Sequence, residues 1–542
     1  MKHRWLYKRS GLALHVALAT PLALLVMLAS PCMADAAVLN LNGQDIDAEA
    51  SGDMVIREGV TMVSEDLLQD EMHLTLEKDG KQFTFENAYK DFSLKGAVGS
   101  DTLLLNGGEK KMSVDAQSID GKLFVPLRPV IELFGDIGWV GADQTVYARY
   151  DYNDQLDIPR VQVSDTPIRY EVPLNSSIAA ENGETPIRVT EGGTLIEKRD
   201  ANNNLIAVQV GDRPLIQPQN EGNILRWGSY EVEDDYLYWM EQPDPSREIT
   251  DDQQWYLYIQ ERKEGAKPEC IDHGSYNEVL SVSPTGGMLN NCDFKNGNII
   301  WLRGEKSTGQ FEARLYQRDT GETITLDSLP FDNRIFTSVT MEVTLGEEDA
   351  FWTRAYFMES MREYGTMKRM HLDTGEIEAF SQGYNLLNPF VAGDHLITRV
   401  KPEGNNFMPD LEKPGTYISG ELWVYDLKKE AWAFKVDNDQ AMIGEENVIS
   451  TPVILDDTHI TVRTDSTYGY SMPVIDLANG TMHATVDDNN MPLMFLPYGL
   501  VDETTTVGDI QSVGKDGSCM ATFQTRIDGM ITPGYAPVYF EW

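Results

Sequence analysis

Basic residues are few in this chain of 542 residues: 44 Lys and Arg stand against 86 Asp and Glu, for a formal net charge of −42. A surface this acidic repels nucleic-acid phosphates, and no local stripe of Lys and Arg reverses its sign. We therefore expect no nucleic-acid partner. The hydrophobic content of 41% is nevertheless too high for a disordered chain. The length predicts two to four domains of about 100 to 200 residues each.

Long apolar runs are missing after the first 30 residues, where no stretch reaches the ~18 to 20 apolar residues that a bilayer span needs. The start of the chain differs. Lys2 to Arg9 is basic, residues 11–30 are uncharged, and Ala34-Asp35-Ala36 is a small-x-small cleavage site. This pattern predicts a signal peptide over residues 1–36, with a retained membrane anchor as the alternative. We expect the protein to be secreted or cell-wall associated, with no membrane span after signal cleavage.

Catalytic and cofactor motifs are also absent. The sequence has no Gly-x-Ser-x-Gly elbow, no phosphate-binding glycine loop and no His-Glu-x-x-His. The histidines beyond residue 36 are scattered and form no His-x-His pair, so we predict no catalytic, cofactor-binding or metal residue. Calcium stays open as a cofactor, although turn formation explains the paired loop carboxylates more simply: Asp234-Asp235, Asp251-Asp252, Asp456-Asp457 and Asp487-Asp488.

A strand, a helix and a second strand are predicted around residue 126. Residues 123–125 form the first strand, Pro126 suits the first turn of a helix, and Gly135 suits the position just past its end. Leu127 and Phe134 recur at helical spacing on the predicted buried face. Trp139 lies in the strand that follows.

These residues resemble a known family. The phrase Gly121-Lys-Leu-Phe-Val-Pro-Leu-Arg-Pro-Val-Ile-Glu-Leu-Phe-Gly135, followed by Gly138-Trp139, resembles the signature of the copper amine oxidase N-terminal-like (stalk) domain. Residues 57–68 resemble a degenerate first copy of this signature. The resemblance implies a small α+β accessory domain over residues 37–150 of an exported bacterial protein, and it implies neither copper nor oxidase chemistry. The structural residues of the motif would be Pro126, Leu127, Arg128, Phe134, Gly135 and Trp139.

Residues 151–180 are polar and rich in proline, and we interpret them as a linker. Beyond them, hairpin turn phrases such as Asp319-Thr-Gly321 and Asp373-Thr-Gly375 recur. A period of about fifty residues indicates a repeat architecture. The turns are marked by Gly211, Gly265, Gly321, Gly375, Glu430, Gly480 and Gly529.

Each repeat also holds an inner strand of aromatic and β-branched residues behind its own polar turn, as in residues 234–239, 296–301 and 348–352. A unit of this length with several short strands and no amphipathic helix is typical of a propeller blade. The sequence therefore predicts a mainly β protein with a β-propeller over residues 181–542. Seven blades are favoured, with six or eight open. The last strand, residues 537–542, would close the ring by pairing with an early strand.

Cysteine is scarce, with four residues in the chain. Cys270 and Cys292 lie late in one repeat and early in the next, so they are candidates for a disulfide in an exported protein, with free thiols as the alternative.

These observations favour an exported non-catalytic binding or scaffold protein of the bacterial cell surface, with an unknown protein or glycan partner. The alternative is an extracellular carbohydrate-active hydrolase or lyase that uses propeller carboxylates, because two such carboxyl groups need only be close in space.

Overall fold

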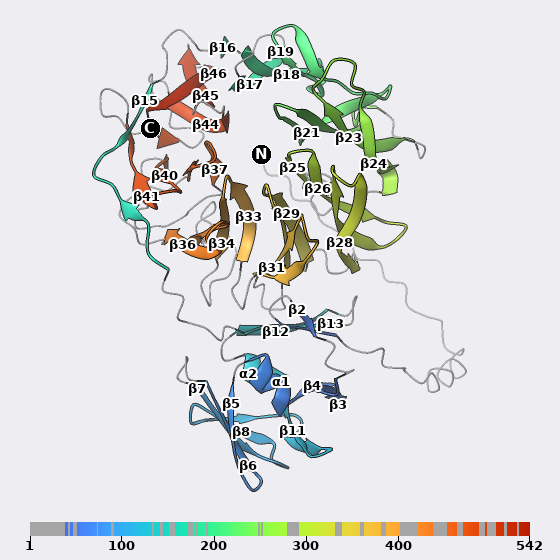
Figure 1. The fold of residues 1–542 in the computed structure, drawn as a ribbon, viewed down its shortest axis with the longest axis vertical. Coiled ribbons are helices and arrows are strands. Elements are labelled where there is room, and N and C mark those ends of the chain that lie inside the picture. Colours follow the sequence, from blue (N-terminus) through green and yellow to red (C-terminus); the bar gives the residue numbers. More distant parts are fainter. Residues whose placement is uncertain are drawn as a thin grey trace, which may run out of the picture.

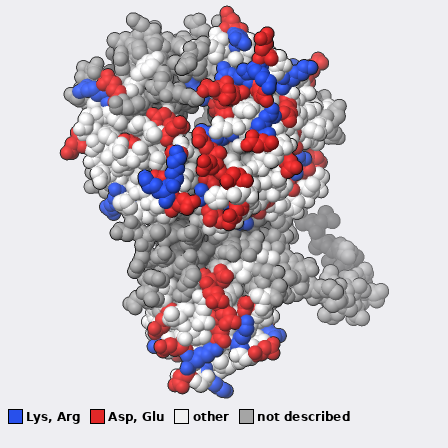
Figure 2. Space-filling view, viewed as in Figure 1, with Lys and Arg blue, Asp and Glu red and all other residues white. Residues whose placement is uncertain are grey.

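The structure is a computed structural model. It describes residues 38–541 apart from 42–43, 47–50, 73, 88–91, 133–134, 141–144, 151–157, 172–177, 180–182, 191–192, 248–249, 251–252, 279–291, 331–338, 358–362, 381–385, 401–420, 437–451, 463–469, 487–493, 496–505, 514–517 and 528–529. The predicted signal peptide lies outside the described residues. The chain is mainly β, as predicted, and forms a small N-terminal module beside a ring of sheets (Figure 1). Asp and Glu are spread over both parts in the view of Figure 2.

The N-terminal module, here called the stalk, consists of three sheets and two short helices. One sheet has the order β12-β13-β1-β2, a second β10-β11-β4-β3, and a third is the meander β5 to β9. Its elements are β1 (Val38–Leu41), β2 (Gln44–Ile46), β3 (Met54–Arg57), β4 (Val60–Ser64), α1 (Glu65–Asp70), β5 (Thr75–Asp79), β6 (Gln82–Asn87), β7 (Phe92–Ala97), β8 (Thr102–Leu105), β9 (Gly108–Lys111), β10 (Gln117–Ile119), β11 (Lys122–Pro126), α2 (Leu127–Ile131), β12 (Gly135–Val140) and β13 (Thr145–Tyr150).

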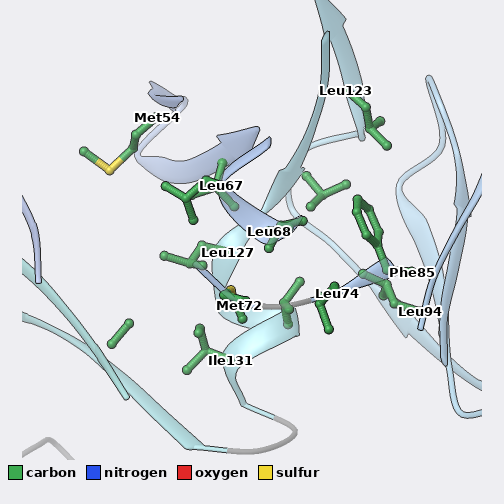
Figure 3. Close-up of a cluster of buried hydrophobic side chains, with 14 of the residues drawn as sticks. Met54, Leu67, Leu68, Met72, Leu74, Phe85, Leu94, Leu123, Leu127 and Ile131 are labelled. Carbon is green, nitrogen blue, oxygen red and sulfur yellow. The ribbon is translucent and has the colours of Figure 1, made fainter. Parts of the chain in front are cut away.

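A strand-to-helix unit occurs twice in the stalk. In the first copy β4 leads into α1, whose N-cap Ser64 accepts a hydrogen bond from the Leu67 amide at 3.1 Å. In the second copy β11 leads into α2, and β11 pairs antiparallel with β4. The helices bury their apolar faces together with Phe85 of β6 in one core (Figure 3). The degenerate copy predicted at residues 57–68 therefore has the same local fold as the clearer one.

The structure describes most of the predicted stalk motif. Pro126 ends β11 and precedes α2, and Leu127 is fully buried. Arg128 donates a hydrogen bond to the Ile137 carbonyl of β12 at 3.3 Å, so its guanidinium connects α2 to the following strand, as suits a structural residue of the motif. Trp139 lies in β12 as expected, but 52% of its surface is exposed. Phe134 lies outside the described residues, and α2 ends earlier than predicted.

Five consecutive sheets of the ring have four antiparallel strands each, in chain order from the inside of the ring to its outer edge (Figure 1). They are β17 (Glu184–Thr190), β18 (Gly193–Arg199), β19 (Leu205–Val210) and β20 (Arg213–Ile216); β21 (Asn223–Val232), β22 (Tyr236–Pro243), β23 (Gln254–Glu261) and β24 (Glu269–Ser275); β25 (Cys292–Lys295), β26 (Asn298–Glu305), β27 (Gln310–Gln317) and β28 (Glu322–Pro330); β29 (Val339–Leu345), β30 (Asp349–Phe357), β31 (Glu363–His371) and β32 (Ile377–Ala379); and β33 (Leu386–Ala392), β34 (His395–Val400), β35 (Glu421–Asp426) and β36 (Ala431–Val436).

Two further sheets complete the described ring, with the orders β14-β41-β40-β38-β37 and β39-β43-β44-β45-β46-β15-β42, where β16 also pairs with β46. Their strands are β14 (Gln162–Val163), β15 (Ile168–Glu171), β16 (Ile178–Ala179), β37 (Val453–Ile454), β38 (His459–Thr461), β39 (Tyr470–Ser471), β40 (Val474–Asp476), β41 (Thr481–His483), β42 (Thr485–Val486), β43 (Met494–Phe495), β44 (Thr506–Val513), β45 (Ser518–Ile527) and β46 (Met530–Glu541). Both depart from the four-stranded pattern, so the blade number stays a prediction.

The turn marks read from the sequence fall between the third and fourth strands of successive sheets. Gly211, Gly265, Gly321 and Gly375 all have positive φ, which is why glycine suits these hairpin turns. The predicted inner strands are the second strands of the sheets, and they carry buried tryptophans such as Trp239 and Trp301. The positions that the sequence predicted for the turns and inner strands of each repeat therefore agree with the strand order of the propeller.

The segment predicted as a linker supplies strands to the ring. β14 pairs parallel with β41, while β15 and β16 both pair antiparallel with β46, the last strand of the chain. The expectation that the last strand pairs with an early one is confirmed. A fragment that begins near residue 180 would lack both β14 and β15, so the domain boundary stays a prediction. The described part of the chain holds no helix long and apolar enough to cross a membrane.

Two leucines of the stalk allow a test of its core. Leu127 is fully buried, whereas Leu104 in β8 is 40% exposed. We expect Leu127→Ala to lower the free energy of unfolding of the stalk by about 2 to 5 kcal/mol, because it removes buried methyl groups and leaves a cavity. Leu104→Ala is the matched control and should cost much less. Urea unfolding of the full chain, followed by exchange of stalk amides, measures both. Equal losses would contradict the described core.

Candidate functional site

Tryptophan–aspartate pairs join successive sheets of the ring. The Trp301 indole N–H on β26 donates to Asp272 on β24 of the preceding sheet at 3.0 Å, and Trp352 on β30 donates to Asp327 on β28 at 3.0 Å. Cations of the tryptophan's own sheet complete each pair, since Arg303 lies 2.5 Å from Asp272 and Lys368 lies 4.0 Å from Asp327. These two carboxylates, Asp327 buried and Asp272 half-buried, therefore hold neighbouring sheets together.

The position of each aspartate depends on a β-bulge between the third and fourth strands. Asp272 is opposite Leu257 and Asp327 is opposite Ala313, immediately before the register shift. The same shift in the first sheet places Ile216 opposite Val208. The third tryptophan of this series, Trp239, is 1% exposed, and its indole nitrogen has no hydrogen-bond partner among the described residues. An apolar residue thus replaces the aspartate at one sheet junction.

A second set of contacts joins the innermost strands. Asp293 on β25 accepts hydrogen bonds from the Thr344 hydroxyl at 2.7 Å and the Leu345 amide at 2.8 Å, both on β29. Burial raises the pKa of Asp293 in spite of these hydrogen bonds. At the equivalent position one sheet earlier, Glu231 pairs with Arg188 of β17 at 2.8 Å. Polar contacts thus join β17 to β21 and β25 to β29, which are the first strands of four successive sheets.

Glu241 is a fully buried carboxylate at the end of β22 that faces amides of the chain. It accepts hydrogen bonds from the Gln219 amide at 3.0 Å, the Asn220 amide at 3.2 Å and the Asn220 side chain at 3.0 Å. Burial raises its pKa, and these hydrogen bonds oppose the rise. Its role is to fix the connection from β20 to β21.

Histidine–aspartate pairs occur at one register position in three sheets, where the second strand begins and the third ends. The cross-strand partners are Asp349 and His371, His395 and Asp426, and His459 and Asp476. In the first pair His371 Nδ1 lies 2.9 Å from Asp349, which also binds Arg369 through two hydrogen bonds of 2.9 and 2.8 Å. His371 is 28% exposed, so this pair reaches solvent.

Carboxylates also gather in the turns between first and second strands, on the side of the ring that carries the short hairpins. We call this set the acidic collar: Glu233, Asp234, Asp235, Glu347, Glu348, Asp394, Asp456 and Asp457. Figure 2 shows Asp and Glu side chains near the middle of the ring on the face in view. The turns pack tightly, because a Cβ on Gly393 would lie 2.3 Å from the Asp457 carbonyl oxygen. Lys428 pairs with Asp394 at 2.5 Å.

The paired loop carboxylates, for which calcium was left open, divide into two groups. Asp456 accepts hydrogen bonds from the Thr458 and His459 amides at 2.7 Å, which is the turn-forming role that the sequence suggested. Asp251, Asp252 and residues 487–490 lie outside the described residues. Within the described segments, no group of three or more His, Cys, Asp or Glu side chains is placed to hold a metal ion.

The predicted disulfide is not formed: both Cys270 and Cys292 are free. Cys270 lies on β24, the outermost strand of its sheet, whereas Cys292 begins β25, the innermost strand of the next. Strands within a sheet are spaced about 4.8 Å apart, and a bridge needs Cα atoms within about 7 Å. Burial raises the pKa of the Cys292 thiol to about 12, so this thiol is protonated at neutral pH.

A small pocket of about 190 Å³ lies beside the hairpin that joins β23 to β24. Arg318, from the turn after β27, reaches into it and pairs with Glu261 at 2.6 Å and Glu269 at 2.8 Å. Because Arg318 bridges two carboxylates of the neighbouring sheet, the pocket is explained as part of a junction between two sheets.

The inter-sheet aspartates and the His–Asp pairs were not identified from the sequence. The sequence did contain a signal for the His–Asp pairs. His371, Asp426 and Asp476 each precede a leucine just before the turn between the third and fourth strands of their sheets. An alignment of the repeats would have placed the three residues in one column. Asp272 and Asp327 could not be found in this way, because the β-bulges that position them cannot be recognised from the residue types around them.

Comparisons with known proteins support the two-part organisation. Residues 39–148 match the family described as Copper amine oxidase N-terminal domain, which confirms the stalk resemblance. No curated protein matches the chain. Among solved structures, TolB from Acinetobacter baumannii is 10% identical over 84% of this chain and 85% of its own, with a TM-score of 0.28.

Two further solved structures are similar to the ring. The β-propeller domain of the Trilobed protease from Pyrococcus furiosus is 9% identical over 66% of this chain and 98% of its own, with a TM-score of 0.38. An oligogalacturonate lyase in complex with manganese is 9% identical over 69% of this chain and 98% of its own, with a TM-score of 0.32. Because these scores are low, the propeller assignment rests on the strand order.

The Trp–Asp pairs predict unequal effects of one substitution at two sites. Trp352→Phe should lower the free energy of unfolding of the ring by about 1 to 3 kcal/mol more than Trp239→Phe does, because it leaves buried Asp327 without its indole donor. Both changes remove similar volume, so the difference isolates the hydrogen bond. Urea unfolding followed by far-UV circular dichroism measures it. Equal losses would contradict a stabilising role for the pair.

His395 predicts how the stability of the ring depends on pH. Burial lowers its pKa in spite of nearby Asp426 and Asp394. Because the pKa of His395 is lowered in the folded state, its imidazole binds a proton at a higher pH in the unfolded chain than in the folded one. The contribution of His395 to the free energy of unfolding therefore has its full value above pH 6.5 and decreases as the pH falls below it. We expect His395→Gln to lose less stability than the wild type between pH 7 and 5 in thermal unfolding. The same substitution at exposed His273 is the control, and identical profiles for His395→Gln and wild type would refute the assignment.

Proposed function

We propose that the protein is an exported, non-catalytic binding or scaffold protein of the bacterial cell surface, in which the ring recognises a protein or glycan partner. The stalk family and the propeller fold support a surface or binding protein. The signal sequence supports export.

The observation that carries the proposal is that carboxylates between the sheets of the ring are used in contacts from one sheet to the next. Asp272, Asp293 and Asp327 each accept hydrogen bonds from the neighbouring sheet. A general acid or base must reach a substrate atom, directly or through one water molecule. Carboxylates that are occupied in sheet junctions serve the rigidity of the ring, and a rigid frame suits binding through the surfaces it presents.

The second candidate function is an extracellular carbohydrate-active hydrolase or lyase. One observation favours it: His371, held on Asp349 at 2.9 Å and partly exposed, has the geometry of an acid–base group oriented by a carboxylate. The buried pairing of Asp349 with Arg369 favours a structural role for the same group.

Binding and turnover are separated by one experiment. The full mature chain is incubated with isolated bacterial wall glycan, with acidic polysaccharide and with isolated envelope protein. Retention on each of these materials and release of new reducing or unsaturated sugar ends from the glycans are measured. We expect saturable binding and no product. Product release that is lost in His371→Gln would establish the enzyme instead. Absence of retention on wall glycan and on envelope protein would contradict the binding proposal.

The acidic collar supplies a matched pair of variants for the same assay. Glu347→Gln with Glu348→Gln changes two exposed carboxylates of the ring, and Glu77→Gln with Glu109→Gln makes the same change in charge on the stalk. If the ring carries the binding surface on its hairpin side, only the first pair alters the salt dependence of binding. If only the stalk pair of substitutions altered the salt dependence of binding, the binding surface would lie on the stalk and not on the ring.

A further inference from the structure

One short segment runs along three sheets before the chain enters the ring. We call residues 158–171 the strap; it follows the stalk in the chain and includes β14 and β15 (Figure 1). It first meets β36, where the Lys435 amide donates to the Pro159 carbonyl at 2.9 Å and the Val161 amide donates to the Lys435 carbonyl at 2.8 Å. The strap thus starts on the outer edge of the fifth four-stranded sheet.

The strap then continues along the next two sheets. The Gln162, Ser164 and Ile168 amides donate to the carbonyls of Gly480, Met482 and Ala484 at 2.8, 2.9 and 2.8 Å. Beyond this, Arg169 pairs with Glu541 as β15 adds to β46. One strap therefore covers the outer strands β36 and β41 and the end of β46, at residues 539–541, whose outward backbone groups would otherwise have no strand beside them. β16, which follows the strap, pairs with β46 further along, at Gly534 and Tyr535.

Three apolar side chains of the strap are buried among otherwise exposed or half-buried neighbours: Ile158, Val161 and Ile168. Ile158 is 6% exposed and joins the cluster around Trp423. Val161 is 3% exposed and lies in the cluster that contains Phe434, whereas Val163 is 42% exposed. The strap is therefore held by buried apolar residues as well as by main-chain hydrogen bonds.

We propose that the strap is a latch that keeps the last three sheets in the ring. Release of the strap uncovers β36, β41 and the end of β46 together. Among the described residues, the sheets from β21 to β32 make no main-chain pairing with the strap, so they stay closed.

Hydrogen–deuterium exchange of the full chain tests the latch with two substitutions on the same strap. Val161→Asp places a carboxylate in the core, while Val163→Asp places the same carboxylate in solvent. We expect Val161→Asp to speed amide exchange in β36, β41 and β46 by at least about tenfold, since tenfold corresponds to only 1.4 kcal/mol. Exchange in β22, β26 and β30 should not change, and Val163→Asp should match the wild type.

Three outcomes would overturn the latch: faster exchange spread evenly over the ring, faster exchange confined to the strap itself, or no change in Val161→Asp. Val161→Ala is the milder variant if Val161→Asp does not fold. It removes two methyl groups without adding a charge, and it must show the same localisation to β36, β41 and β46 at smaller amplitude. An even distribution in Val161→Ala would equally refute the proposal.

Discussion

The pairing of β46 with β15 is the constraint on which the ring depends. A row of sheets that packs face to face has two ends, and each end would expose apolar surface and strand edges. The last strand of the chain meets a strand that precedes the first sheet, so the two ends are joined by main-chain hydrogen bonds. This pairing covers the edge of the last sheet and ties it to the segment that leads into the first sheet.

Closure alone does not set the spacing between sheets. Buried polar contacts do this at several junctions: Trp301 to Asp272, Trp352 to Asp327 and Asp293 to Thr344. A buried hydrogen bond is costly to leave unmade, so each one penalises slippage of one sheet against the next more steeply than apolar packing would. The junction at Trp239 lacks this contact and depends on apolar packing, in a cluster that also contains Val208 and Ile216 of the preceding sheet. The ring is therefore not uniform around its circumference.

Local chemistry explains what the sequence could predict. Hairpin glycines need positive φ, so Gly321 and Gly375 mark the same turn in two sheets and reveal the repeat. The strand-to-helix unit at Pro126 was visible for a similar reason, because a buried strand followed by a proline-led helix is a local pattern. The mainly β class, the stalk and the propeller follow from such patterns.

Long-range pairing explains what the sequence could not predict. β14 has two residues, and its partner β41 lies more than 300 positions further along the chain, so nothing local distinguishes it from a linker. Ile158, Val161 and Ile168, which are buried in the structure, were visible in the sequence as apolar residues in a polar segment. The disulfide prediction assumed that sequence proximity meant contact, but Cys270 and Cys292 occupy opposite edges of adjacent sheets.

The central claim is that the chain forms a ring closed by β15 and β46. Arg169 and Glu541 are cross-strand partners and both are exposed, so cysteines at these two positions test the closure directly in a full chain whose native cysteines are changed to serine. Cross-strand neighbours hold their Cβ atoms about 4.5 to 5.5 Å apart, so mild oxidation should give an intramolecular crosslink in the monomer and raise its unfolding temperature. Failure to crosslink, or crosslinks only between two chains, would contradict a closed ring.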